Sequence, residues 1–159
     1  MSFIEINSEI GELEGVILHT PGVEIEMMTP NSIQEAVYSD LLNLKIASKE
    51  YSNFSGVLNK WTKTYQVKEL LAEILLNKEV KSSLVSKILA AEKKEELFAE
   101  LIEKDNTELA TILIEGYKKG NGFALNPLYN LFFTRDASSS VYDKVLIHSM
   151  STNVRDRES

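Results

Sequence analysis

The sequence lacks cysteine entirely among its 159 residues. The chain can therefore form neither a disulfide nor a thiolate zinc site, and it holds no thiol nucleophile. It also lacks a basic amino-terminal leader followed by an apolar stretch, and it has no run of about 20 apolar residues that could form a membrane helix. We therefore expect a cytoplasmic protein with no membrane partner.

Positive charge is scarce as well, because 17 Lys and Arg stand against 24 Asp and Glu, giving a formal charge of -7. Nucleic-acid-binding proteins normally present a basic face, so no nucleic acid is expected as a partner. A few arginines could still hold a small anionic substrate. The hydrophobic fraction of 43% and charged fraction of 26% are ordinary for a globular protein, and the length suits one domain.

The amino-terminal region has the pattern of an α/β unit. The segment Leu13 to His19 contains three consecutive apolar residues, Val16 to Leu18, which predicts a largely buried strand that Pro21-Gly22 ends. Two helices and a return strand are predicted to follow: a helix capped by Asn31 or Ser32 and reaching Leu44, a second over 47–61, and a strand from Thr64 to Val67.

The segment from about Lys68 to Lys119 is predicted to be helical throughout, because its apolar residues recur at helical spacing. Asp105 and Glu108 resemble a helix start, where carboxylates lie near the positive end of the helix dipole. Gly120-Asn121-Gly122 is predicted to stop the last helix. The apolar stripes are Val80, Leu84, Val85, Ile88 and Leu89; Leu97, Phe98, Leu101 and Ile102; and Leu109, Ile112, Leu113 and Tyr117.

From Phe123 onward the β pattern returns. Leu131 to Thr134 and Val141 to His148 are predicted to be strands separated by Ser138-Ser139-Ser140. The charged run from Val154 to Ser159 looks like the first turn of another element.

The sequence has little that indicates a metal or cofactor site. His19 and His148 stand at the ends of apolar runs, without a Ser, Cys or metal-ligand partner at diagnostic spacing, which favours structural histidines over catalytic bases. The sequence also contains no phosphate loop and no paired-histidine motif. We therefore expect neither a cofactor nor a metal.

The most informative segment is Pro127 to Asp136, PLYNLFFTRD, which we interpret as an apolar strand ending in an Arg-Asp pair. The Asp136 carboxylate could accept two parallel hydrogen bonds from a guanidinium. Asn130 offers a donor and an acceptor to an amino-acid head group, and the ring of Phe133 could line an aliphatic chain. The residues alone favour structural roles, with Asp136 paired to Arg135 or capping the next turn, and with Phe133 in the core.

Three landmarks, taken in order, resemble the arginine deiminase family of the guanidine-modifying amidinotransferase superfamily. They are Ser8 to Pro30 (SEIGELEGVILHTPGVEIEMMTP), Asn130 to Asp136, and Val154 to Glu158 (VRDRE), with a helical stretch between the first two. There are two departures. Ala137 stands where the family usually has proline, and Tyr142-Asp143-Lys144 stands at a turn where the family has a glycine pair.

The resemblance implies the fold. It is an α/β class fold, a partial α/β-propeller of pentein-type ββαβ units with an inserted helical bundle, and this chain would form its amino-terminal portion. The domains expected are a first αβ unit over 1–67, the helical insertion over 68–119, and the start of a second αβ unit over 120–159.

The resemblance also implies an activity. In the family a cysteine thiolate attacks the guanidinium carbon of arginine, and water resolves the covalent intermediate to citrulline after ammonia leaves. Asp136 would be a catalytic acid that holds the guanidinium. Asn130, Phe133 and Arg155 would bind the substrate, with Arg155 clamping its carboxylate.

The family places its nucleophile, histidine and second acid in a later portion, so this chain is expected to be inactive alone. Its expected partner is the small-molecule substrate arginine, and self-association into a homo-oligomer stays open. Two alternatives remain: a non-catalytic scaffold or interaction domain, and another enzyme of the superfamily, either an amidinotransferase or a citrulline-directed hydrolase.

Overall fold

The computed structural model describes residues 4–27 and 42–159, and within these ranges the chain combines helices with three separate two-stranded sheets, none of them closed. The predicted α/β class is therefore confirmed. The sheets pair β1 (Gly15–Leu18) with β2 (Lys63–Gln66), β3 (Tyr117–Lys119) with β4 (Gly122–Leu125), and β5 (Ser138–Val141) with β6 (Lys144–Ile147).

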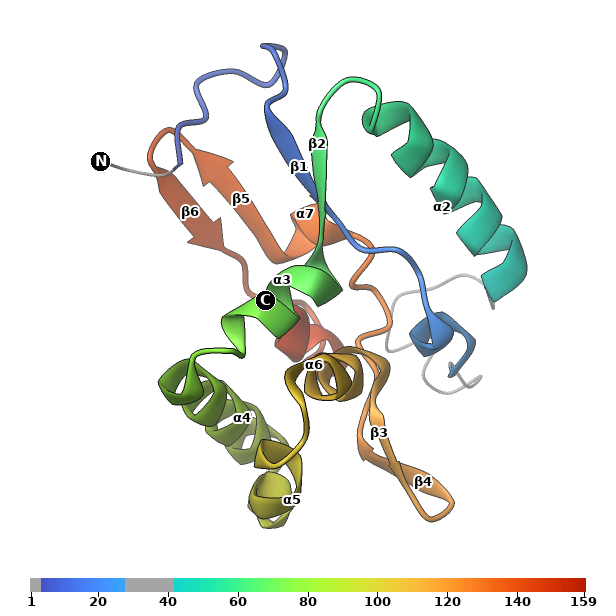
Figure 1. Ribbon diagram of the computed structural model, residues 1–159, viewed down its shortest axis with the longest axis vertical. Coiled ribbons are helices and arrows are strands. Elements are labelled where there is room, and N and C mark those ends of the chain that lie inside the picture. The colour runs from blue at the N-terminus through green and yellow to red at the C-terminus, as the bar shows by residue number, and fades with distance from the viewer. Residues whose placement is uncertain (1–3, 28–41) are drawn as a thin grey trace.

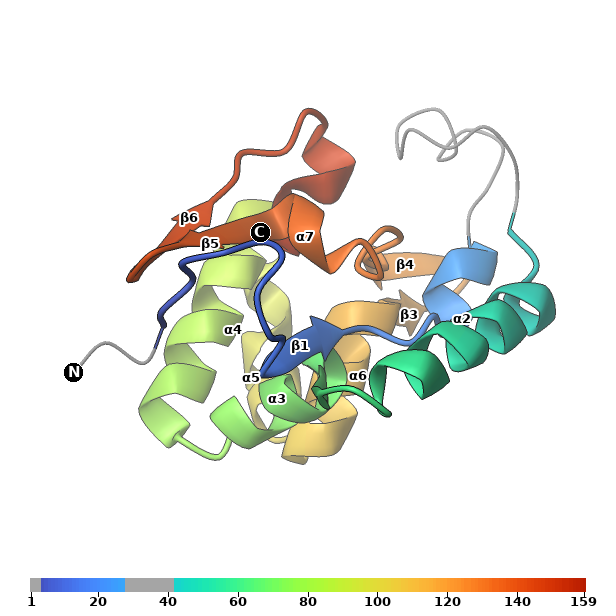
Figure 2. The same cartoon turned by 90° about the horizontal axis from the view of Figure 1, so that it is seen from above.

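Helices lie on both sides of the small sheets, with α2 on the side opposite α4 and α5. Figure 1 shows α4, α5 and α6 together at one end of the molecule, and the β5–β6 hairpin toward the other. Both views place β1 between this hairpin and α2 (Figure 2). No helix in the described ranges is long and apolar enough to cross a membrane. The helices are α2 (Leu44–Leu58), α3 (Val67–Ile74), α4 (Lys78–Glu92), α5 (Phe98–Ile102), α6 (Asn106–Glu115), α7 (Thr134–Ala137), and the 3-10 helices η1 (Val23–Met27), η2 (Glu95–Leu97) and η3 (Asn153–Glu158).

The first unit is a parallel strand pair whose connection carries α2. Asn43 caps this helix by accepting a hydrogen bond from the Ile46 N–H. The strand predicted from Leu13 to His19 is confirmed as β1, and the return strand is confirmed with a shift of one residue. The helix predicted over 47–61 corresponds to α2, whereas most of the helix predicted to start at 31 or 32 lies outside the described residues.

The prediction that β1 is largely buried was wrong. Leu18 is buried, but 51% of Ile17 is exposed. Parallel strands are buried when further strands and helices cover both faces of their sheet. In the described part of the chain, β1 pairs only with β2, and Ile17 lines an apolar groove together with Leu70 of α3 and Ile88 of α4.

The helical bundle holds the main hydrophobic core. The three predicted apolar stripes supply most of its buried residues, including Val85, Leu89, Leu101, Leu109 and Leu113. The predicted helix start is also confirmed, because Asp105 caps α6 by accepting hydrogen bonds from the N–H groups of Thr107 and Glu108 at 2.8 and 3.1 Å. Local periodicity and capping therefore account for this region.

The last helix ends earlier than predicted, at Glu115. Gly116 follows with a φ of 86°, and a Cβ there would lie 2.9 Å from the Leu125 carbonyl oxygen. Only glycine meets both conditions without strain. Gly120-Asn121 instead connects the strands β3 and β4, so the prediction that this segment stops a helix was wrong.

The predicted strand from Leu131 to Thr134 is also wrong. The chain makes consecutive turns here, with Phe133 N–H donating to the Asn130 carbonyl at 2.9 Å and Asp136 N–H to the Phe133 carbonyl at 3.0 Å. The predicted spacer Ser138 to Ser140 belongs to β5, because pairing with β6 overrides its weak strand propensity. The turn expected at Tyr142-Asp143 does join these strands.

The charged run at residues 154–159 forms most of η3, which confirms the predicted further element. Arg157 anchors it to the helical bundle. Its Nη2 donates to the Leu113 carbonyl at 2.7 Å, and its Nη1 donates to the Asn126 carbonyl at 2.9 Å. This anchorage places the neighbouring Arg155 beside the 130–136 turns.

Candidate functional site

Two of the residues predicted from the sequence form an ion pair. Arg155 Nη2 in η3 donates to Asp136 Oδ2 in α7 at 3.0 Å. The Asp136 side chain is 48% exposed, whereas that of Arg155 is only 12% exposed. The carboxylate is thus accessible from solvent, while the guanidinium approaches it from the protein side.

Glu158 extends this pair into the protein. Its Oε2 accepts a hydrogen bond from Arg155 Nε at 2.8 Å, and its Oε1 accepts one from the Asn130 backbone N–H at 3.0 Å. Asn130 is also buried. The four residues Asn130, Glu158, Arg155 and Asp136 therefore form one continuous polar chain from the interior to the surface.

Burial and charge act together on this cluster. Burial raises the pKa of Glu158, although the hydrogen bond from Arg155 acts in the opposite direction. The guanidinium of Arg155 is partly desolvated, which lowers its pKa, but its hydrogen bonds to Glu158 and Asp136 raise that pKa overall. Arg155 is therefore a permanent cation held between two carboxylates.

Phe133 does not lie in the core, so the structural role that the residues alone favoured for it is wrong. Its ring is 48% exposed and lies 4.2 Å, centroid to centroid, from the ring of Phe132. Phe132 instead packs against the cluster of Ile25 and Tyr129. The pair thus presents one aromatic ring to the interior and the other to the surface, directly before α7.

Neighbouring contacts hold the Asp136 segment in place. Arg135 pairs with Glu9 through Nη2, at 3.0 and 2.9 Å from the two carboxylate oxygens, so the alternative Arg135–Asp136 pairing is not formed. The Thr134 hydroxyl donates to the Ile17 carbonyl of β1 at 3.2 Å. These contacts leave the Asp136 carboxylate to Arg155.

His148 is a second support that follows β6. Its backbone N–H donates to the Ala137 carbonyl at 3.0 Å, and its Nδ1 lies 2.9 Å from the Asp136 carbonyl oxygen. Its Nε2 lies 3.0 Å from the Ser139 hydroxyl. Both ring nitrogens of His148 thus have hydrogen-bond partners, as expected for a structural histidine.

His19 also has a hydrogen-bond partner. Its Nε2 lies 3.0 Å from Glu24 Oε1, and both side chains are buried. Burial raises the pKa of Glu24. Hydrogen bonds from His19 and from the Gly22 N–H lower this pKa by more than burial raises it, so the net shift is downward. The pair fixes the turn after β1.

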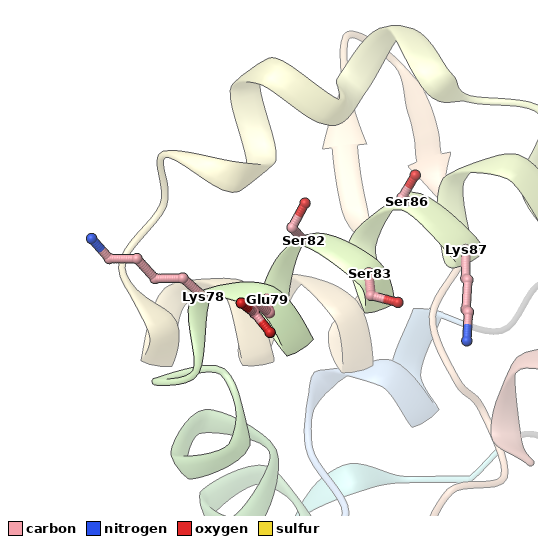
Figure 3. A pocket seen from close by; sticks show the side chains of 6 residues that line it. All are labelled: Lys78, Glu79, Ser82, Ser83, Ser86 and Lys87. Carbon is pink, nitrogen blue, oxygen red and sulfur yellow. The ribbon is translucent and has the colours of Figure 1, made fainter.

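The described residues contain no group of three or more His, Cys, Asp or Glu that could hold a metal ion. A polar hollow does lie on α4, lined by side chains of that helix alone. Figure 3 shows Ser82 and Ser86 pointing to one side, and Ser83 and Lys87 to the other. Because these groups do not converge on one point, the hollow offers no chemical site comparable to the Asp136 cluster.

The sequence predicts Asn130, Asp136 and Arg155 as site residues but does not predict Glu158, which links Asn130 to Arg155 in the structure. A local signal existed, because Arg155 and Glu158 are three residues apart and such residues lie on one side of a helical turn. No comparable pattern pointed to His148, whose contact with Asp136 depends on the β5–β6 hairpin.

The class that these features define is a mixed α/β protein with a carboxylate–guanidinium site built on turns and a short 3-10 helix. Known proteins similar to this chain carry one description. Residues 101–159 match the family model described as arginine deiminase. The arginine deiminase of Bacillus cereus (strain B4264) is 32% identical over 180 residues, and that of Staphylococcus aureus (strain Newman) is 31% identical over 179 residues.

Both alignments cover 98% of this chain and 44% of the relative. The chain therefore spans less than half the length of the curated relatives it matches. The predicted resemblance to the arginine deiminase family is confirmed, and it extends over nearly all residues of this chain.

Proposed function

We propose that this chain forms the substrate-binding part of an arginine deiminase, an enzyme that hydrolyses L-arginine to L-citrulline and ammonia. The observation that carries the proposal is the 3.0 Å contact between Asp136 Oδ2 and Arg155 Nη2. The carboxylate expected to hold the substrate guanidinium already receives a guanidinium and is half exposed. The names of the similar proteins support the same substrate.

The proposed roles follow the two charged ends of arginine. Asp136 binds the guanidinium, because a carboxylate matches both its charge and its parallel N–H groups. Arg155 binds the carboxylate of the substrate. Asn130 contacts the amino-acid head group, and the exposed ring of Phe133 lines the aliphatic part.

The proposed reaction is covalent. A cysteine thiolate attacks the guanidinium carbon, the C–N bond to one nitrogen breaks, and that nitrogen leaves as ammonia after receiving a proton. Water then attacks the same carbon and releases citrulline and the thiol. Since this chain contains no cysteine, the thiol has to come from residues outside it, and the isolated chain is inactive.

We also propose the finer fold description implied by the family. In it, residues 1–67 form a first αβ unit, 68–119 a helical insertion and 120–159 the start of a second αβ unit of a pentein propeller. The parallel β1–β2 pair supports the first unit, and the core within α3–α6 supports the helical insertion. The open edges of the small sheets suit a propeller that further strands complete.

The test is a titration of the 159-residue chain with L-arginine, followed by amide resonances in ¹⁵N–¹H spectra. We expect shifts at Asp136 and Arg155, and weaker binding by Asp136→Asn. Loss of a charge-assisted hydrogen bond costs about 1.5–3 kcal/mol, which is roughly ten- to more than hundred-fold in affinity. The matched control is Asp156→Asn, which removes the same charge at an exposed position beside Arg155.

Three outcomes would contradict the proposal: no binding of L-arginine, equal affinity in Asp136→Asn, or tighter binding of L-citrulline. The last would favour a citrulline-directed relative, because the ureido group of citrulline is neutral. The isolated chain should also form no citrulline. Stoichiometric citrulline from the pure chain would refute the thiolate mechanism.

A further inference from the structure

The Arg155 guanidinium lies between two carboxylates of different character. Its Nη2 contacts Asp136 Oδ2 at 3.0 Å, and its Nε contacts Glu158 Oε2 at 2.8 Å. The Asp136 side chain is half exposed, whereas that of Glu158 is only 2% exposed. One partner is therefore open to exchange with solvent and ligands, and the other is fixed in the interior.

Glu158 is fixed because its second oxygen is also engaged. Oε1 accepts the Asn130 backbone N–H at 3.0 Å, which ties the carboxylate to the turn that leads to Asp136. A planar guanidinium can use its Nε edge and its terminal nitrogens on separate acceptors. Arg155 can thus keep Glu158 on one edge while its Nη2 changes partner.

We propose that Glu158 is a positioning residue that holds Arg155 in place while Arg155 exchanges Asp136 for the carboxylate of an incoming ligand. The ligand class is an amino acid that carries a guanidinium, so this inference rests on the proposed function. In the structure, the Arg155 guanidinium contacts the Asp136 carboxylate. When the ligand binds, its guanidinium takes over Asp136, and the released Nη2 of Arg155 faces the ligand carboxylate.

This exchange gives the site a selectivity that Asp136 alone does not supply. A ligand with a guanidinium but no carboxylate would displace Arg155 from Asp136 and leave Nη2 of this largely buried residue without an anionic partner. An unmade hydrogen bond of a buried charged group weakens binding about tenfold or more. L-Arginine is therefore expected to bind at least tenfold more tightly than agmatine, its decarboxylated analogue.

Glu158→Gln separates the two contacts of this carboxylate. The amide oxygen of Gln could still accept the Asn130 N–H, but the amide group carries no charge to hold Arg155. We expect the preference for L-arginine over agmatine to fall from about tenfold to near one, mainly through weaker binding of L-arginine. Glu103→Gln, at an exposed position of the helical bundle, is the matched control and should keep the preference.

The experiment titrates the 159-residue chain and each variant with L-arginine and with agmatine, and follows the same ¹⁵N–¹H spectra. A ligand-free measurement accompanies it: solvent exchange of the Arg155 Nε–H, which is slow in the parent chain if Glu158 holds it. Exchange should accelerate in Glu158→Gln and stay slow in Asp136→Asn. Arg155→Lys is the second variant, because a lysine ammonium cannot hold two carboxylates on separate edges, and it should also abolish the preference.

The inference is overturned if Glu158→Gln keeps the preference for L-arginine, or if its Arg155 Nε–H exchanges as slowly as in the parent chain. Should Glu158→Gln not fold, a retained preference in Arg155→Lys would overturn it in the same way. Failure of the proposed function looks different, because then neither ligand shifts any resonance of the parent chain.

Discussion

The helical bundle of α3–α6 and the segment of residues 126–159 are held together by different physical means. The bundle packs leucine and valine side chains into one core, and Asn77 and Asp105 cap two of its helices. The later segment consists of turns, a short hairpin and η3, and its described contacts are largely ion pairs and hydrogen bonds. The comparison indicates that stability lies mostly in the bundle, while the proposed binding residues lie where the chain is polar and partly exposed.

The largest expected effect tests this division of stability. Leu101 is fully buried in the bundle core, and Leu101→Ala should lower the free energy of unfolding by about 3 kcal/mol, because it removes apolar contacts and leaves a cavity. Ile147 on β6 is 75% exposed, so Ile147→Ala should cost less than about 0.5 kcal/mol. Urea unfolding of both variants measures the difference, and similar losses would mean that the hairpin contributes to the same core.

A smaller effect distinguishes the two arginines of η3. Arg157 contacts the helical bundle, whereas Arg155 contacts the candidate site. Arg157 donates to the carbonyls of Leu113 and Asn126, so Arg157→Met leaves these acceptors without their donor and should cost about 2 kcal/mol of stability. Arg155→Met removes contacts to Asp136 and Glu158 and should instead abolish L-arginine binding. Thermal midpoints and ligand titrations of both variants measure this contrast.

The opposite pattern would reassign the two residues. If Arg157→Met kept its stability and lost ligand binding, Arg157 would be the binding arginine and η3 would dock through Arg155. Arg157→Lys is a useful control, because it retains the charge but cannot donate to both carbonyls in the same geometry. It should recover only part of the lost stability.

The same contrast explains what could be predicted from the sequence. The bundle was predictable because helices depend on local periodicity and on caps such as Asp105. The end of α6 was not, because Gly116 is required by the approach of the Leu125 carbonyl, which depends on the β3–β4 hairpin that follows the helix. The apolar run of Leu131 to Thr134 has the composition of a strand, but the hydrogen bonds of its turns and the packing of Phe132 beside Ile25 decide its conformation.

The candidate site was predictable only through family resemblance. Composition and spacing alone favoured structural roles for Asp136 and Phe133, whereas the resemblance identified Asn130, Asp136 and Arg155, which the structure brings into one cluster. Glu158 was missed because a charged run near the end of a sequence usually indicates solvated residues. Its burial depends on contacts with Asn130, which no local pattern reveals.

The smallest expected effect concerns how stability depends on pH, through the buried carboxylates of Glu24 and Glu158. The pKa of Glu24 is lowered in the folded chain despite burial, because His19 and the Gly22 N–H donate to it. The stability that it contributes is fully present above its unfolded pKa of about 4.3 and is lost as the pH falls through the lower folded pKa. Glu158 has the opposite sign, because burial raises its pKa, so its ionisation costs stability as the pH rises.

We therefore expect Glu24→Gln to be less stable than the parent chain at pH 7, and this difference should shrink as the pH falls below about 4.3. The stabilisation comes from an ionised carboxylate, and protonation of Glu24 makes the parent chain resemble the variant. Thermal midpoints between pH 7 and about 3 measure the effect. It should be smaller than the stability losses expected for Leu101→Ala and Arg157→Met. Glu12→Gln changes an exposed carboxylate and should leave the pH dependence unaltered. A difference between Glu24→Gln and the parent chain that grew toward low pH would show that the ionised form of Glu24 is not the one that the fold favours.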